Sequence, residues 1–191
     1  MRKVLIILSV LVIGTGSCGQ KTAKEFYDKN FKWKITIPKE LKVVNAEEWA
    51  KLKERGLLAK GEINGEDDGT LICAFNNGEL NAFEAVYIPF DPEVDGNYIE
   101  KYKRPIEKMY KAFVTRMPNN VVDTLTTIEQ IDNLDFYVLK IKITTPNNKI
   151  FNMLSYNRLF EKKLFVLDIC YINEEIGQKM LNAWKNSTFG K

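Results

Sequence analysis

Residues 121–172 contain four segments with strand-like patterning, and only short turn sequences separate them. The segments read VVDTLTTIEQI, LDFYVLKIKIT, KIFNMLSYNRLF and KLFVLDICYI. The sequence places turns at Asp132-Asn133, at Pro146-Asn147-Asn148 and at Glu161–Lys163. A parallel crossover needs a dozen or more residues, so connections this short join antiparallel neighbours. The pattern therefore predicts a four-stranded antiparallel meander.

Further strand and helix patterns surround this meander. FKWKITIP, residues 31–38, alternates apolar and polar side chains and predicts a half-buried strand that ends at its proline. Helical spacing appears in residues 45–56, in 96–118 and in 173–186, with Asn45 as an N-cap of the first helix. Between the first two helices, LICAF and AFEAVYIPF predict a hairpin. A proline inside the longest helix, Pro105, should kink it or divide it in two.

The last strand of the meander is apolar on both faces. Phe165, Leu167 and Ile169 point to one side of it, and Val166 and Cys170 point to the other. A sheet that is apolar on both faces needs cover on both sides. We therefore expect an α+β protein, a three-layer α/β/α sandwich with a largely antiparallel sheet, built as a single globular domain over residues 26–191.

Two segments resemble the PsbP-like superfamily of α/β/α sandwiches. They are FKWKITIP near the start of the domain and LFVLDICYINEEIGQKMLNAWKNSTF at its end. The resemblance covers the order of elements over most of the domain. It implies the PsbP-like fold and, because members of that superfamily are mostly binding or assembly proteins, a function in binding.

The start of the chain has the layout of an export signal. Arg2 and Lys3 precede an apolar segment of ten residues, 4–13, which is too short for a comfortable membrane span. Small residues then lead into Cys18. The residues alone allow an ordinary secretory signal, an uncleaved anchor or a lipoprotein signal.

The segment GTGSC resembles the lipoprotein box of bacterial envelope proteins, and SCGQK resembles lipoproteins of the Bacteroidota type. This resemblance implies that residues 1–17 are a cleaved signal peptide and that Cys18 becomes an acylated N-terminus. Residues 18–25 would then be a lipidated tether. The expected location is the cell envelope, at the outer membrane facing the periplasm, with the membrane as a partner through the anchor at Cys18.

The charge balance argues against a nucleic-acid partner. The whole chain carries 28 basic and 25 acidic residues, and residues 1–17 contain two basic and no acidic ones. Cleavage would therefore lower the net charge from +3 to +1. A nearly neutral domain has little electrostatic attraction for nucleic acid.

The chain contains no histidine, and this restricts its chemistry. Serine and cysteine hydrolase triads and histidine-ligated metals are thereby excluded in their usual forms. No CxxC pair, phosphate loop or dinucleotide fingerprint is present. We therefore predict no cofactor and no catalytic activity, and a binding function toward another envelope protein or complex. The alternatives are an envelope hydrolase that uses carboxylates, and a sensor or carrier of a small ligand.

One charged residue, Asp168, lies in the middle of the most apolar strand. A three-residue turn at Glu161–Lys163 would place Tyr156 opposite Asp168, with Arg158 on the diagonal. An unpaired buried carboxylate is costly, so we expect these residues to form a polar cluster. The cluster would be structural, or it would be a ligand or acid–base site.

Besides Cys18, the chain has two cysteines, Cys73 and Cys170. An exported protein can keep a disulfide, and both residues lie in apolar strand-like runs. The sequence therefore allows either a disulfide between them or two buried thiols.

Overall fold

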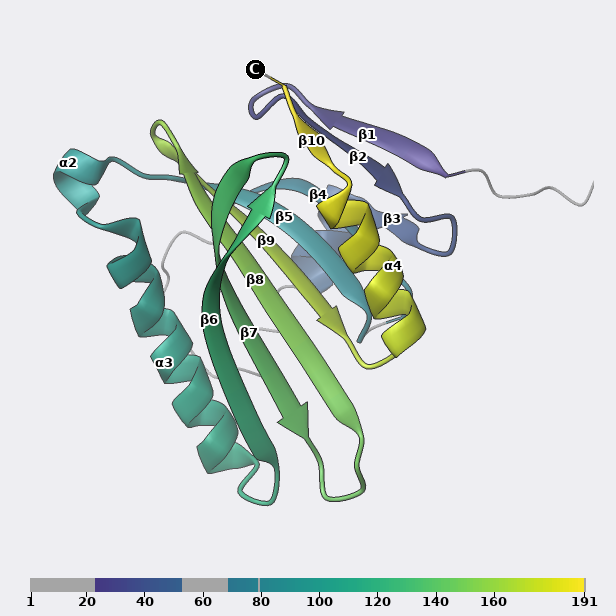
Figure 1. Cartoon of the computed structure of the whole chain (residues 1–191). Coiled ribbons are helices and arrows are strands. Elements are labelled where there is room, and N and C mark those ends of the chain that lie inside the picture. Colours follow the sequence, from purple (N-terminus) through teal and green to yellow (C-terminus); the bar gives the residue numbers. More distant parts are fainter. Residues whose placement is uncertain (1–22, 53–68, 79, 191) are drawn as a thin grey trace, which may run out of the picture.

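A seven-stranded antiparallel sheet forms the centre of the protein, in the strand order β3-β4-β5-β9-β8-β7-β6 (Figure 1). The computed structural model describes residues 23–52, 69–78 and 80–190 of the 191-residue chain. The strands are β1 (Lys24–Asp28), β2 (Trp33–Ile37), β3 (Lys42–Val44), β4 (Thr70–Asn76), β5 (Ala82–Pro89), β6 (Val121–Ile131), β7 (Leu134–Thr144), β8 (Ile150–Phe160), β9 (Lys163–Tyr171) and β10 (Thr188–Phe189). The helices are α2 (Pro92–Asp95), α3 (Tyr98–Arg116) and α4 (Glu174–Lys185), and residues 46–52 are also helical.

The predicted meander is confirmed as β6, β7, β8 and β9, which pair in this order. The predicted hairpin is β4–β5, and β5 pairs with β9 to extend the same sheet. Every strand pair in the described part of the chain is antiparallel. The three hairpins of the meander follow from its short connections, which leave no room for crossover helices.

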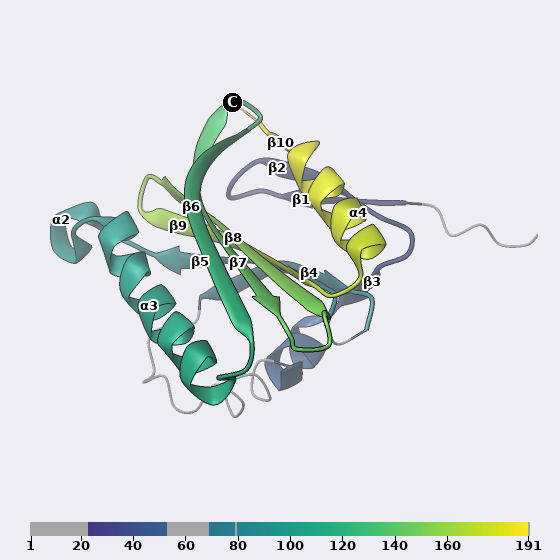
Figure 2. The same cartoon turned by 60° about the horizontal axis from the view of Figure 1, so that its bottom comes forward.

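The sheet is covered on both faces, as the apolar pattern of the last strand predicted. Helix α4 lies on one face and α3 on the other, as Figure 2 shows from a second direction. A small second sheet, in the order β1-β2-β10, joins α4 on its side. The three-layer α/β/α arrangement is therefore confirmed, with this small sheet as an addition to one outer layer.

The largest part of the core lies between the sheet and α4. Trp33, Phe165 and Trp184 are fully buried there. The Trp184 ring lies 5.1 Å from the ring of Phe136 and 5.4 Å from that of Tyr156, measured between centroids. This aromatic cluster joins α4, the small sheet and the central strands into one hydrophobic core.

One predicted boundary is wrong. Strand β1 begins at Lys24, so the segment expected to be a tether to residue 25 already pairs with β2. Helix α3 runs without a break through Pro105, which excludes the division of this helix and leaves the kink as an expectation. Its N-terminus is capped by Asn97, whose side chain accepts hydrogen bonds from the backbone N–H groups of Ile99 and Glu100.

The cap predicted for the first helix is confirmed, because the backbone N–H of Glu48 donates to the side-chain oxygen of Asn45 at 2.8 Å. The predicted C-terminal end of that helix lies outside the described residues. Neither Cys73 nor Cys170 is part of a disulfide within the described residues. Cys73 packs into the core on the α4 side, and the alternation of β9 turns Cys170 to the opposite face of the sheet. The two cysteines therefore do not form a disulfide.

Candidate functional site

Two hairpins of the meander separate at one end of the sheet. The β7–β8 ladder stops at the pair Tyr137 and Asn157. The β6–β7 ladder continues to its turn, and so does the β8–β9 ladder, which ends at Phe160 and Lys163. Both hairpins thus extend beyond the ladder that they share, and their tips diverge in Figure 1. The divergence leaves a gap between two strands that are neighbours elsewhere.

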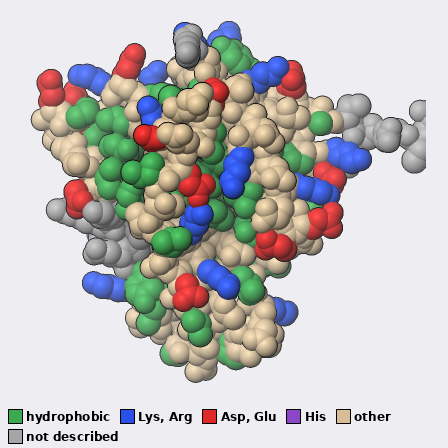
Figure 3. Space-filling model, in the orientation of Figure 1, with side chains coloured by type: hydrophobic (Ala, Val, Ile, Leu, Met, Phe, Trp, Pro, Cys, Tyr) green, Lys and Arg blue, Asp and Glu red, His purple; other side chains and the backbone are tan. Residues whose placement is uncertain are grey.

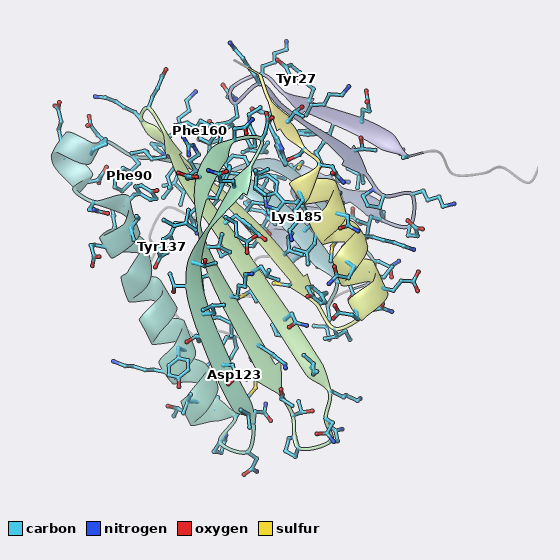
Figure 4. The ribbon with its side chains drawn as sticks, viewed as in Figure 1. Tyr27, Phe90, Asp123, Tyr137, Phe160 and Lys185 are labelled. Atoms are coloured by element: carbon cyan, nitrogen blue, oxygen red, sulfur yellow. The ribbon has the colours of Figure 1, made fainter. Side chains whose placement is uncertain are left out.

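A cavity of about 760 Å³ lies at this end of the sheet, and we call it the tip pocket. The turns between β1 and β2, between β6 and β7 and between β8 and β9 surround it, together with β10. Its lining consists of Asn30, Phe31, Lys32, Asp132, Asn133, Leu134, Arg158, Leu159, Phe160, Glu161, Lys163, Phe189 and Gly190. Figure 4 shows one of these residues, Phe160, at the end of the sheet between the two hairpin tips.

Several turn residues of the tip pocket have an unusual backbone conformation. Lys32, Asp132, Asn133 and Glu161 all have positive φ, at 48°, 50°, 62° and 52°. Aspartate and asparagine tolerate this left-handed region, but lysine and glutamate have no such preference. A left-handed residue of this kind costs roughly 1–3 kcal/mol, and such residues cluster at binding sites. The conformation of Lys32 and Glu161 therefore makes the tip pocket a candidate binding site.

Aromatic rings form the apolar wall of the tip pocket. The Phe160 ring lies 5.3 Å from that of Phe31, nearly perpendicular to it, and 5.5 Å from that of Phe189, nearly parallel. Phe31 and Phe189 are buried, whereas Phe160 is half-buried. Because the three rings come from β8, the β1–β2 turn and β10, the wall joins elements that are distant in the sequence.

Arg158 is the most constrained charged group of the tip pocket. Its Nη1 donates to the backbone carbonyl of Asp135 at 2.5 Å, across the gap between the hairpins. Its guanidinium carbon lies 5.4 Å from the centre of the Phe160 ring and 6.0 Å from that of Phe136. Its Nε is buried and has no hydrogen-bond acceptor within the described part of the chain. The guanidinium is therefore held in place, and because Nε is buried, a ligand would have to meet the N–H groups of the two Nη atoms.

Other polar groups of the tip pocket hold its walls together. The Asp132 carboxylate accepts a hydrogen bond from the backbone N–H of Phe189 at 2.7 Å. The backbone N–H of Gly190 donates to the carbonyl of Lys32 at 2.8 Å. These bonds fix the end of the chain against two of the turns.

The charges of the tip pocket do not quite cancel. Its basic side chains are Lys32, Arg158 and Lys163, and its acidic ones are Asp132 and Glu161. The lining therefore carries a net charge of +1.

The predicted polar cluster is wrong in its register. The β8–β9 turn has two residues, 161–162, so Phe160 faces Lys163. Tyr156 consequently lies opposite Leu167, and Asp168 lies opposite Ser155. Because a shift of one residue reverses the face, Asp168 projects from the side of the sheet opposite to Tyr156 and Arg158.

Tyr156 has a different acidic partner, Glu129. The Tyr156 hydroxyl donates to this carboxylate at 3.1 Å, and the Lys140 ammonium lies 2.6 Å from it. Burial alone would raise the pKa of Glu129, but the bonds from Lys140 and Tyr156 outweigh it and leave this pKa lowered. Burial, followed by the Glu129 charge, raises the pKa of Tyr156. The pair is a structural contact beside the aromatic core.

Asp168 belongs instead to a row of polar residues on the α3 side of the sheet. Glu84 lies directly opposite it in β5, and the buried Ser155 lies opposite it in β8. Asn157, two residues beyond Ser155, is fully buried. The alternation in KIFNMLSYNRLF places Ser155 and Asn157 on one face, which is the signal that could have revealed this row. None of these residues lines the tip pocket.

Metal-binding clusters and membrane-spanning helices are both absent from the described residues. Residues 23–52, 69–78 and 80–190 contain no group of three or more histidine, cysteine or acidic side chains placed to hold a metal ion. No helix among them is both long enough and apolar enough to cross a membrane. Cys18 and the predicted signal peptide lie outside the described residues.

The architecture is that of the PsbP-like fold. The solution structure of cyanobacterial PsbP (CyanoP) from Synechocystis matches the chain with a TM-score of 0.55 and 9% sequence identity, over 92% of this chain and 96% of that one. This match confirms the predicted fold class. No family model matches the sequence, and a search of the curated proteins found no match.

Two further solved structures show weaker similarity. A crystal structure from Bacteroides thetaiotaomicron has a TM-score of 0.45 and 7% identity, covering 88% of this chain and 48% of that one. LpqN of Mycobacterium tuberculosis, described as involved in cell envelope biogenesis, has a TM-score of 0.41 and 8% identity, covering 89% of this chain and 91% of that one.

Proposed function

We propose that this protein is a lipid-anchored envelope protein that acts by binding another envelope component at the tip pocket. The observation that carries the proposal is the tip pocket itself, where three turns and β10 converge on an aromatic wall beside a fixed arginine. Binding sites combine apolar walls with a few well-placed polar groups in this way.

The polar groups of the tip pocket favour binding over catalysis. Asp132 is occupied by the backbone of β10, and Arg158 is fixed by a carbonyl and two aromatic rings. An arginine stays protonated in proteins, so it recognises a partner better than it transfers a proton.

The anchor at Cys18 gives the domain its place in the cell. Five residues, 19–23, separate Cys18 from Lys24, where β1 begins, and an extended chain over these six steps would reach about 20 Å. Two or more acyl chains give stable attachment, so the domain would stay close to the membrane surface. We expect Cys18→Ala to release the protein from the membrane fraction or to leave it as an uncleaved precursor. A native N-terminus that maps downstream of Cys18 would contradict the anchor.

Site-specific photocrosslinking in intact cells tests the binding face. A crosslinking residue at Asn30, on the rim of the tip pocket, is compared with one at Asn147, in the β7–β8 turn at the other end of the sheet. Both positions are exposed asparagines in hairpin turns, so they make a matched pair. We expect a discrete adduct from position 30 that position 147 does not give. Equal adducts from both positions, or adducts from position 147 alone, would refute the tip pocket as the binding face.

The volume of the tip pocket also favours the second candidate, a carrier or sensor of a small ligand. About 760 Å³ lies within the usual range for small-molecule sites, roughly 300–1,000 Å³. In that case the adduct from position 30 would contain a small molecule in place of a protein, which mass spectrometry of the adduct distinguishes.

A further inference from the structure

We propose that the tip pocket recognises a single carboxylate attached to a flat apolar group, and that Arg158 binds this carboxylate. The inference rests on the proposed function, since it names the chemical group that the tip pocket would select. It depends on the position of Arg158, the aromatic wall and the charge balance of the lining.

The position of Arg158 suits an anionic ligand. One of its N–H groups bonds the Asp135 carbonyl, which fixes the plane of the guanidinium. The rings of Phe136 and Phe160, whose centres lie 6.0 and 5.4 Å from the guanidinium carbon, restrict its motion further. A fixed guanidinium presents the remaining N–H groups of its two Nη atoms in a planar fork, the geometry that matches a carboxylate. Little side-chain entropy is then lost on binding.

The charge balance of the tip pocket selects the charge of the ligand. With three basic and two acidic side chains, the lining carries a net charge of +1. One negative charge neutralises it, whereas a doubly charged phosphate would leave an excess beside Asp132 and Glu161. Like charges at this range disfavour each other, so a monoanion fits best.

The aromatic wall selects the rest of the ligand. Phe160 is the half-buried ring of the aromatic wall, and the buried rings of Phe31 and Phe189 pack against it. A flat apolar body can pack against the exposed part of the Phe160 ring, which favours aromatic over branched groups. Two sources supply this chemistry: a free aromatic acid, and the C-terminal carboxylate of a polypeptide that ends in an aromatic residue.

The test measures the binding of 2-naphthoate to the protein purified in a nonionic detergent. Ligands of this size reach dissociation constants of about 1 mM, which NMR titration detects. We expect 2-naphthoate to bind and its neutral amide to bind at least about 10-fold more weakly, because a hydrogen bond to a charged group is lost. The doubly charged 2-naphthyl phosphate should bind no better than the carboxylate.

Variants assign the binding to Arg158. Arg158→Gln should weaken naphthoate binding at least about 10-fold, and Arg158→Lys, which keeps the charge but loses the fork, should weaken it less. Lys149→Gln, an exposed lysine in the β7–β8 turn, removes the same charge far from the tip pocket and should change nothing. Thermal unfolding checks that each variant is folded, and the lysine variant keeps the test valid if the glutamine variant is not.

N-Acetylglycyl-phenylalanine and its amide distinguish the two sources. Tighter binding of the free-acid peptide than of 2-naphthoate points to a polypeptide C-terminus, and the reverse points to a free aromatic acid. The inference is overturned if neither acid binds up to about 5 mM, if Arg158→Gln leaves binding intact in a folded protein, or if the phosphate binds more tightly. Such results would leave the crosslinking test of the proposed function unaffected, since that test does not depend on the chemistry of the ligand.

Discussion

Replacement of Trp184 by alanine tests how α4 is held on the sheet. The Trp184 side chain is fully buried, and its ring meets those of Trp33, Phe136, Tyr156, Phe165 and Phe189 at centroid distances of 5.1–6.1 Å. A tryptophan cut to alanine in a core costs about 3–5 kcal/mol in the free energy of unfolding. Because domains of this size have about 5–15 kcal/mol in total, Trp184→Ala should leave a weakly stable protein.

A second substitution at Trp184 separates the loss of packing from the loss of the indole N–H. The Nε1 of Trp184 is buried and has no acceptor among the described residues, so it contributes a desolvation cost without a hydrogen bond. Trp184→Phe keeps most ring contacts and removes this donor. We expect it to cost less than about 2 kcal/mol, clearly less than the alanine variant.

Urea unfolding followed by circular dichroism measures both effects. With a slope of about 1–3 kcal/mol per molar urea, Trp184→Ala should lower the midpoint by about 1 M or more. Lys185→Ala, the exposed neighbour in α4, is the matched control and should stay within about 0.5 kcal/mol of the unsubstituted protein. An unchanged midpoint for Trp184→Ala would show that α4 does not dock through this residue.

Three further predictions concern single contacts. A Cβ at Gly177 in α4 would lie 2.5 Å from Cγ of the Tyr171 ring, so Gly177→Ala should lower the free energy of unfolding by about 1–3 kcal/mol, although alanine favours helices. A urea titration measures this change, and a stabilised variant would contradict the close approach. Because the folded-state pKa of Glu129 is lowered, the contribution of this carboxylate to stability is present above about pH 4.5 and is lost as the pH falls through the folded-state pKa. Lys140→Gln should raise this pKa and move acid unfolding to higher pH, and an unchanged acid transition would count against the pairing of Glu129 with Lys140. Burial raises the pKa of the Cys73 thiol, so a thiol reagent should modify Cys170 before Cys73 in the native protein, as peptide mass spectrometry would show; equal rates would argue against the burial of Cys73.

The sequence predicted the fold correctly where local chemistry and the global arrangement agree. At Asp132-Asn133 both residues tolerate a positive φ, and the predicted two-residue turn is the observed one. Asn45 could be placed as a cap from its spacing alone, and the structure confirms its bond to Glu48. Such signals are readable because the residue type itself favours the conformation.

The register at Asp168 could not be predicted for the opposite reason. Glu161 has a φ of 52° in a two-residue turn, yet glutamate gives no indication of that conformation. A turn one residue longer would shift the pairing of β9 with β8 by one residue, so each β9 residue would lie opposite a different β8 residue. The predicted cluster with Tyr156 and Arg158 thus failed because the turn has two residues and not three, whereas the burial pattern of β9 itself was predicted correctly.

The tip pocket was also beyond reach of the sequence. Its residues come from three turns and β10, at positions from 30 to 190. The sequence pattern predicted a contact for Arg158, but with Asp168. The observed contact of Arg158 is the Asp135 carbonyl. This contact forms because the β7–β8 ladder ends before the β8–β9 ladder does, and no residue type indicates where a ladder ends.

The small sheet sets the order in which this chain can complete its fold. Strand β10 pairs with β2, so residues 188–189 meet residues 33–34 across almost the whole domain. Phe189 also closes the aromatic core beside Trp33. While the chain is being synthesised from its N-terminus, β2 therefore lacks one of its neighbours until residues 188–189 have emerged. Contacts between distant parts of a chain slow folding, so the domain would complete its core only once residues 188–189 are available to pair.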